Sequence, residues 1–492
     1  MSLSVDDVFR LGREGKLQAK ALIPGHQPKS TFETRNPYDN SVIGQVDRCD
    51  QDSVNAAVQV ARATFDSGEW SKLAHAARKG VLLRWVGLLR EHADELAALD
   101  CLDAGKPITE CLNTDIPETI HTLAWYAEAA DKLFGTVAPS PDNVMALVVK
   151  EPVGVVGTVL PWNFPAQMFS WKVGPALAAG NSVIVKPAEL TSLSAYRMVQ
   201  LAHEAGVPAG ALTLVTGFGE ETGQPLGLHP DVDVVSFTGS TEVGRLFLQY
   251  SARSNLKGIV LECGGKSPQI IFEDAYPLAE VVNDLLSAAF WNMGENCSCG
   301  SRLLVHRSRK QELIELLTSR LSEWVIGDPT DPATKIGPMV EEVHYQKVRS
   351  YLDIAKREGA RLVYGGETLP LGSGWFVQPT IFDEVTSSMR LFQEEVFGPV
   401  LAITSFDTEE ESIRLANATQ YGLAASLYTA DVRRAHRVSK AIRAGTVSVN
   451  CFSEGNITTP FGGYKLSGFG GRDNGLEAFN QYLETKTIWY AN

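Results

Sequence analysis

The chain has 492 residues, of which 44% are hydrophobic and 21% charged, and its formal net charge is −14. This length exceeds what one hydrophobic core usually serves, and the composition is typical of a soluble globular protein of two or more domains. The acidic balance argues against nucleic acid or an anionic membrane surface as a partner, since both bind basic faces.

The sequence also bears on the cellular compartment. No apolar run approaches the ~18–20 residues that span a bilayer, and the N-terminus lacks a basic region followed by an apolar one. The seven cysteines are scattered and show no paired zinc-type CxxC spacing. We therefore expect a cytoplasmic protein with free thiols and no metal site.

In chain order, the first predicted elements are long helices over 50–65, 75–102 and 116–132. From about residue 153 onward, short β-branched runs alternate with amphipathic helical stretches. This alternation predicts parallel sheets covered by helices, an α/β fold. The expected strands are 153–160, 182–186, 212–215, 232–237, 258–262, 269–272, 302–305, 400–405 and 446–450.

Two of these strands end in turns that suit a phosphate-bearing ligand. Strand 182–186 runs into KPAE, and strand 232–237 runs into TGSTEVG. Parallel sheets bind ligands at the carboxyl ends of their strands, with phosphates near helix N-termini. Simple capping of a helix by Ser240 or Thr241 explains the second turn equally well. That turn is not a Walker loop, because no lysine follows Gly244.

Three further segments carry residue types that are used in catalysis. Asn163 lies in PWNFP after a strand, Glu262 ends strand 258–262 beside two glycines, and Cys297 closes NMGENC after an apolar helix. Each also has an ordinary structural explanation: a proline-rich turn, a turn anion and a packed thiol. Taken singly, none of the three identifies a catalytic site.

Taken together and in order, seven segments resemble the aldehyde dehydrogenase superfamily. The similarity extends from about Phe32 to Trp489, and the segments are PWNFP, KPAE, FTGSTEVG, ECGGKSP, NMGENC, EEVFGPV and PFGGYKLSG. The resemblance implies a Rossmann-like NAD-binding domain (1–129 and 153–264), an α/β catalytic domain (265–470) and a small β bridging or oligomerisation segment (130–152 and 471–492). Strands 144–150 and 483–489 would join the subunits of a homodimer or homotetramer.

The resemblance also implies a mechanism. Cys297 would attack the aldehyde carbon and later carry the acyl group as a thioester. The side-chain amide of Asn163 and the backbone N–H of Cys297 would bind the oxyanion. Glu262 would activate the water that hydrolyses the thioester. Its presence favours a free acid over an acyl-coenzyme A as product, and the intact trio argues against an inactive structural homologue.

By the same resemblance the cofactor is NAD, with NADP as a possible alternative. Lys186 and Glu189 would hold the adenosine ribose, and Glu189 would repel the 2′-phosphate of NADP. Ser240 would contact the pyrophosphate, Glu395 would bind the nicotinamide ribose, and Phe397 would pack beside it. The remaining expected cofactor residues are Pro161, Trp162, Gly239 and Gly264.

Three cysteine or acidic residues depart from the usual family pattern. Cys263 stands where relatives usually carry leucine. Asp473 stands where many carry a glutamate that is sometimes proposed as a proton relay, and its shorter side chain puts that role in doubt. Cys299 could trap Cys297 in a reversible disulfide, although packing is the simpler explanation.

Within the family the chain resembles bacterial dehydrogenases of polyamine catabolism, which act on ω-amino, guanidino or γ-glutamylamino aldehydes. Asp115 and Glu118 are three residues apart on an expected helix, so they should share a face that attracts a cation. Stabilisation of the helix start explains them equally well, and a broad-specificity aldehyde dehydrogenase is the alternative function. The other expected substrate residues are Glu454 and an aromatic sleeve of Phe164, Trp171, Trp291 and Phe452.

Overall fold

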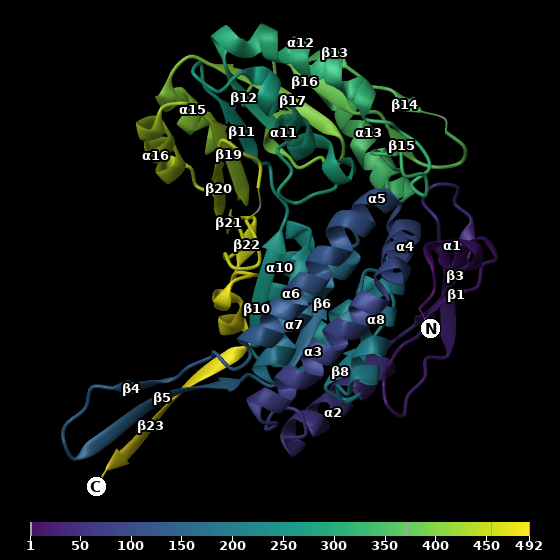
Figure 1. Cartoon of the computed structure of the whole chain (residues 1–492), viewed down its shortest axis with the longest axis vertical. Helices are drawn as coiled ribbons and strands as arrows, with labels where there is room; N and C mark the ends of the chain where they lie inside the picture. The colour runs from purple at the N-terminus through teal and green to yellow at the C-terminus, as the bar shows by residue number, and fades with distance from the viewer. Residues whose placement is uncertain (1, 370, 454, 492) are drawn as a thin grey trace.

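The computed structural model describes residues 2–369, 371–453 and 455–491. Figure 1 shows two bodies, one above the other, and a narrow ribbon that projects from the lower body. A largely parallel sheet with helices packed around it forms the centre of each body. This arrangement confirms the α/β fold predicted from the sequence.

The N-terminal segment adds a small sheet and several helices to the lower body. Its first helix begins at a capping box made by Ser4 and Asp7. The helix expected over 75–102 is divided at His92, whose φ of −110° and ψ of 17° interrupt the regular helix. The elements are α1 (Val5–Arg13), β1 (Leu17–Ala19), β2 (Ser30–Arg35), β3 (Val42–Arg48), α2 (Gln51–Ser67), α3 (His75–Glu91), α4 (Ala93–Ala104), α5 (Ile108–Glu110), the π-helical turn η1 (Cys111–Asp115) and α6 (Ile116–Ala129).

The sheet of the lower body has the strand order β22-β10-β9-β6-β7-β8 and is parallel except at β22. Chain order therefore runs outward from β6 in both directions. The carboxyl ends of the strands at such a reversal form a crevice for ligands. The elements are β6 (Val155–Val159), α7 (Pro165–Ala179), β7 (Ser182–Lys186), α8 (Leu193–Ala205), β8 (Leu212–Leu214), η2 (Gly219–Gly223), α9 (Gln224–Leu228), β9 (Val234–Gly239), α10 (Thr241–Ala252), β10 (Gly258–Cys263) and β22 (Gly468–Phe469).

The sheet of the upper body has the order β13-β16-β17-β12-β11-β19-β20 and is parallel except at β13. The elements are β11 (Pro268–Ile271), α11 (Leu278–Phe290), η3 (Trp291–Gly294), β12 (Arg302–His306), η4 (Arg307–Arg309), α12 (Lys310–Arg320), η5 (Leu321–Glu323), α13 (Glu342–Arg357), β13 (Arg361–Tyr364), β14 (Thr368–Leu369), β15 (Phe376–Val377), β16 (Thr380–Asp383), α14 (Arg390–Gln393), β17 (Val400–Phe406), α15 (Glu409–Ala416), β18 (Tyr421–Gly422), β19 (Ala424–Tyr428), α16 (Val432–Ala441), β20 (Thr446–Val449) and β21 (Tyr464–Lys465).

The projecting ribbon is formed by β4 (Thr136–Ala138), β5 (Val144–Pro152) and β23 (Leu483–Ala491), which follows η6 (Leu476–Gln481). β5 pairs antiparallel with both other strands. Val137 and Trp489 on this ribbon are exposed. Among the helices of the described residues, none combines the length and the apolar character that a membrane crossing requires.

Candidate active site

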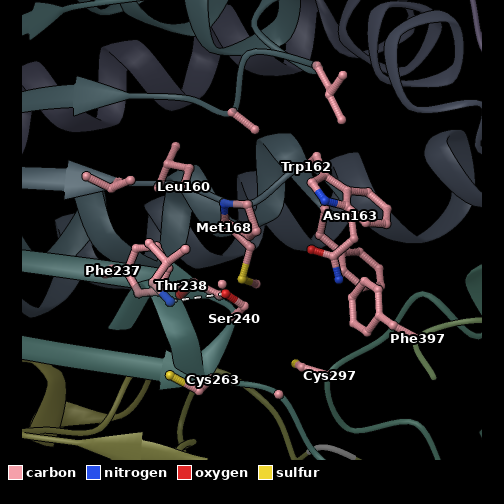
Figure 2. Close-up of a pocket in the computed structure, with 18 of the residues that line it drawn as sticks. Leu160, Trp162, Asn163, Met168, Phe237, Thr238, Ser240, Cys263, Cys297 and Phe397 are labelled. Carbon is pink, nitrogen blue, oxygen red and sulfur yellow. Dashed lines mark hydrogen bonds between the residues drawn. The ribbon is translucent and has the colours of Figure 1, made fainter. Parts of the chain in front are cut away.

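A cavity of about 370 Å³ lies where β6, β7, β9 and β10 end, which is within the range of small-ligand sites. Asn163 and Cys297 both line it. Figure 2 shows Trp162, Asn163 and Phe397 on one side of this cavity and Phe237, Thr238 and Ser240 on the other. All nine residues that the sequence assigned to the cofactor also line it: Pro161, Trp162, Lys186, Glu189, Gly239, Ser240, Gly264, Glu395 and Phe397.

Cys297 follows a sharply bent segment of chain. The preceding turn η3 contains three consecutive residues with positive φ, namely Asn292 (51°), Met293 (57°) and Gly294 (69°). Left-handed backbone at residues other than glycine is strained and persists where the surrounding structure requires it. Cys297 is partly exposed and reaches the cavity, whereas most of the other described cysteines are buried.

Asn163 is held beside this bend by hydrogen bonds. Its Nδ2 donates to the carbonyl oxygen of Glu295 at 2.8 Å. The Nδ2 of Asn292 donates to the same carbonyl at 3.0 Å and to the carbonyl of Asn163 at 3.3 Å. Because a side-chain amide carries two N–H groups, Asn163 has a second one to offer to a ligand oxygen.

Glu262 lies near the end of β10 but is not among the side chains that line the described part of the cavity. The side chain is buried, and a Cβ added at Gly462 would come within 2.5 Å of its Oε1. Burial and the neighbouring Asp473 raise the pKa of Glu262 well above its ordinary value, while Lys172 and Arg472 act in the opposite direction. The carboxylate is therefore electrostatically suited to take up a proton.

A buried polar network surrounds Glu262. Lys172 Nζ lies 3.0 Å from Asp473 Oδ2, and both side chains are fully buried. The same ammonium donates to Ser236 Oγ at 3.2 Å, and the hydroxyl of Tyr482 donates to Ser236 Oγ at 3.1 Å. Asp473 thus lies close to the proposed base even though its side chain is shorter than a glutamate.

The part of the cavity that Lys186, Glu189 and Ser240 line has features that suit a dinucleotide. The buried Nζ of Lys186 lies 3.3 Å from Glu189 Oε2, and burial lowers the pKa of this lysine. Ser240 caps α10 by accepting a hydrogen bond from Val243 N at 3.2 Å, which confirms the capping interpretation of this turn. The N-terminus of this twelve-residue helix therefore faces the cavity, as an anion-binding site requires.

Glu395 is fixed against the backbone at the end of β10. Its Oε1 accepts a hydrogen bond from Gly265 N at 2.8 Å. A Cβ at Gly264 would lie 2.1 Å from its Oε2, so only glycine permits this approach. The rings of Phe397 and Trp162 meet edge to face, with their centroids 5.4 Å apart.

The residues of the cavity wall that were not assigned from the sequence include two ionisable ones, His344 and Lys347. His344 and Lys347 both line the cavity from α13. His344 Nε2 donates to the carbonyl of Phe397 at 2.7 Å and lies 3.3 Å from Glu295 Oε1. The one sequence signal was their spacing of three on an expected helix, which places both on one face.

Aromatic side chains gather near Cys297, as the sequence predicted for most of them. Phe164 and Trp171 belong to one buried cluster, against which Trp291 and Cys297 pack. The ring centroids of Phe164 and Trp291 are 5.2 Å apart. The other members of the cluster are Met168, Leu423 and Phe461. Phe452 is half-buried and outside this cluster, so its role stays a prediction.

The acidic residues expected at the substrate entrance need correction. Asp115 is fully buried and forms an ion pair with Lys106, whereas Glu118 is exposed and lies 3.7 Å from His121. Positions three apart on a helix are separated by about 60°, and the border between the buried and exposed faces falls between these two. They therefore do not form one cation-attracting face. Glu454 lies outside the described residues.

The two unusual cysteines are both buried. Cys263 lines the cavity, and burial raises its pKa to about 12, so its thiol stays protonated. Cys299 is buried, and its Sγ lies 3.4 Å from the carbonyl oxygen of Ala289. These contacts are typical of packed thiols.

Comparison with known proteins identifies the family. A profile of the Aldehyde dehydrogenase family matches residues 23–488. The chain is 54% identical to aminoacetaldehyde dehydrogenase of Pseudomonas aeruginosa, with 93% of this chain and 92% of that protein aligned. It is 42% identical to the NADP/NAD-dependent aldehyde dehydrogenase PuuC of Escherichia coli, over 98% and 97% of the two chains.

Solved structures agree. An indole-3-acetaldehyde dehydrogenase complexed with NAD+ superposes with a TM-score of 0.97 at 45% identity, with 100% of both chains covered. The gamma-glutamyl-gamma-aminobutyraldehyde dehydrogenase of Burkholderia cenocepacia superposes with a TM-score of 0.96 at 46% identity, over 99% of this chain and 100% of that one. The chain therefore belongs to the aldehyde dehydrogenase family, and it is an oxidoreductase that uses NAD(P)+ to oxidise aldehydes.

Proposed function

We propose that the protein oxidises a cationic or amino-substituted aldehyde to a carboxylate through a thioester on Cys297. The observation that supports this mechanism most directly is the placement of Cys297 and Asn163 on one cavity with the residues expected to hold the dinucleotide. The buried carboxylate of Glu262 at the end of β10 supplies a base.

Each step uses a named group. The Cys297 thiolate forms a bond to the aldehyde carbon, and the resulting oxyanion is bound by the Asn163 amide and the Cys297 backbone N–H. When bound, NAD+ would supply the hydride acceptor that oxidation of this adduct needs, and Cys297 would then carry the acyl group as a thioester. Glu262 then takes a proton from water, whose oxygen adds to the acyl carbon. The C–S bond breaks, the thiolate is restored, and the carboxylate leaves.

The dinucleotide would be held along the ends of the lower sheet. Lys186 and Glu189 would contact the adenosine ribose, and Ser240 at the start of α10 would contact the pyrophosphate. Glu395 would bind the nicotinamide ribose. The Glu189–Lys186 pair favours NAD over NADP, because the carboxylate of Glu189 would repel the 2′-phosphate.

Variants of the nucleophile and base test this mechanism. Cys297→Ala should abolish NADH formation with every aldehyde, because no adduct forms. Glu262→Gln should release about one equivalent of NADH per enzyme and then stall, because the thioester is not hydrolysed. Stopped-flow absorbance at the NADH band measures both. Turnover by Cys297→Ala at the normal rate, or unimpaired steady-state turnover by Glu262→Gln, would contradict the proposal.

The substrate class is supported by relatives named for amino-substituted aldehydes and by one carboxylate of this chain. Glu110 in α5 is half-buried, and its Oε2 accepts a hydrogen bond from Trp291 Nε1 at 2.8 Å. Trp291 in turn packs against the aromatic cluster that contacts Cys297. Glu110 therefore replaces Asp115 in our proposal as the group that attracts an ω-ammonium.

A comparison of two aldehydes tests the role of Glu110. Glu110→Gln keeps an acceptor for Trp291 but removes the charge, so KM for 3-aminopropanal should rise roughly tenfold while KM for propanal changes little. Glu118→Gln, an exposed carboxylate nearby in sequence, is the matched control. Equal KM changes for both aldehydes would rule out recognition of the cation by Glu110.

A further inference from the structure

A buried ion pair lies next to the active-site turn, and the mechanism above does not use it. Lys106 follows α4, and Asp115 ends η1; their side chains are each 1% exposed. Burying two charges is costly, and a buried ion pair commonly adds little net stability over an apolar pair of similar size. Such a pair therefore calls for an explanation beyond stability.

The ammonium of Lys106 makes all its contacts inside the protein. Besides Asp115, its Nζ donates to the carbonyl oxygen of Asn163 at 3.1 Å. It also lies 3.7 Å from the centre of the Phe164 ring. An ammonium has three N–H groups, and these three partners account for them. Two of the partners are the proposed oxyanion donor and the first aromatic residue of the substrate wall.

The backbone of η1 explains how Asp115 reaches the lysine. Cys111–Asp115 is a π-helical turn between two α-helical segments. A π turn inserts one residue into a helix and so rotates the following side chains relative to the helix before it. Such insertions cost stability, and they occur often at functional sites.

The segment 163–166, which begins at Asn163, is held at its other end by a residue of α4. Asp100 is 1% exposed, and its Oδ2 accepts a hydrogen bond from Ala166 N at 3.3 Å. Lys106 holds Asn163 and Asp100 holds Ala166, so buried ionisable groups from one short stretch of chain fix both ends of residues 163–166. Asn292 binds the Asn163 carbonyl from the opposite body at 3.3 Å.

From these contacts we propose that Lys106, with Asp115 as its counter-ion, is a positioning residue that aims the Asn163 amide at the reacting oxygen and fixes the Phe164 ring. The proposal rests on the oxyanion role of Asn163 in the function proposed above. Lys106 itself contacts no reacting atom, so its effect should reach the reaction only through Asn163 and Phe164. A small misplacement of an oxyanion donor is enough to lower a rate strongly.

A double-mutant cycle separates positioning from general stability. Asn163→Ala should lower kcat about 100–1000-fold. Lys106→Met should lower kcat at least roughly tenfold with little change in KM for NAD+. The double variant should be no slower than Asn163→Ala alone, because nothing remains to be aimed. All rates are expressed per titrated Cys297 thiol, so that misfolded enzyme does not count.

Lys310→Met is the matched control. Lys310 Nζ lies 3.0 Å from Asp383, a carboxylate with 0% exposure, and neither residue lines the cavity. This variant should change the unfolding temperature but leave kcat per thiol within about twofold of normal. Asp115→Asn repeats the cycle with the lysine retained, in case Lys106→Met does not fold.

The outcomes are distinct. If Asn163→Ala keeps normal kcat, the proposed oxyanion role fails. Suppose instead that Asn163→Ala is slow. If Lys106→Met or Asp115→Asn then lowers kcat by the same factor in the wild-type enzyme and in the Asn163→Ala variant, the positioning role alone is overturned. It is also overturned if neither substitution lowers kcat in either protein.

Discussion

Glu262 illustrates how strongly its surroundings can change the chemistry of one residue. An ordinary glutamate titrates near pH 4.3 and is a weak base at neutral pH. Here burial raises the pKa of Glu262, Asp473 raises it further, and Lys172 limits the increase. The network therefore adjusts the side chain toward the pH at which a general base is most effective.

The sign of this shift gives a prediction on pH. Because the pKa of Glu262 in the folded protein is raised, its basic form appears only as pH rises above the range of an ordinary glutamate, and thioester hydrolysis should accelerate in that range. Asp473→Asn removes the neighbouring negative charge, which lowers the pKa of Glu262. The acidic limb of the hydrolysis profile should then move to lower pH. Single-turnover hydrolysis measured across pH checks this.

Glu262→Gln provides the control, because it should lack the limb altogether. An acidic limb at the same pH in the wild-type and Asp473→Asn proteins would show that the limb belongs to another group.

The ends of strands show what the sequence predicts well. The ends of β6, β9 and β10 carry PWN, Ser240 and the Glu262–Gly264 segment, and the alternating sequence pattern predicts each of them at a strand end. Parallel strands bring such ends to one edge of a sheet, so the main members of the cavity wall were predictable.

Other features of the site and the fold were not predictable from the sequence, for identifiable reasons. The inward turn of Asp115 depends on the π-helical η1, which residue spacing does not reveal. His344 and Lys347 lie on an ordinary amphipathic helix, and only packing against Phe397 turns them toward the cavity. Residues 468–469 pair with β10 of the lower sheet, although the expected boundary at 470 assigned them to the other domain.

The end of β10 carries a prediction of its own. In Gly264→Ala the new Cβ would clash with both carboxylate oxygens of Glu395, at 2.1 and 2.4 Å. Displacing Glu395 should raise KM for NAD+ roughly tenfold or more, because the proposed nicotinamide-ribose contact is lost. Steady-state kinetics at varied NAD+ concentration measures this change.

Gly87→Ala is the control for that substitution, since Gly87 is a helical glycine with nothing within 4 Å of an added Cβ. It should leave KM unchanged and raise stability slightly. An unchanged KM in Gly264→Ala would contradict the proposed ribose contact.

On the scale of the whole molecule, the projecting ribbon presents an edge strand and exposed apolar side chains. β23 forms one edge of its sheet, and Trp489 and Tyr490 are 63% and 50% exposed. Exposed apolar edge strands tend to pair with another chain. We propose that this ribbon joins copies of the chain into a dimer or tetramer.

Removal of residues 484–492 should therefore reduce the oligomer to monomers, as measured by light scattering coupled to gel filtration. The substitution pair Trp489→Ser and Tyr490→Ser keeps the strand but removes the apolar surface, and it should weaken assembly in the same direction. Unchanged molar mass in both would contradict the proposed role of the ribbon.

The late position of Asp473 and Tyr482 in the chain has a consequence for biosynthesis. Both residues surround a base that lies some two hundred residues earlier, and β22 completes the edge of a sheet whose other strands end by Cys263. Nascent chains fold from the N-terminus as they leave the ribosome. The strands that end by Cys263 can thus assemble before Asp473 is synthesised, so a nascent chain stalled ahead of Asp473 should bind cofactor before the proposed base Glu262 has the neighbour that raises its pKa.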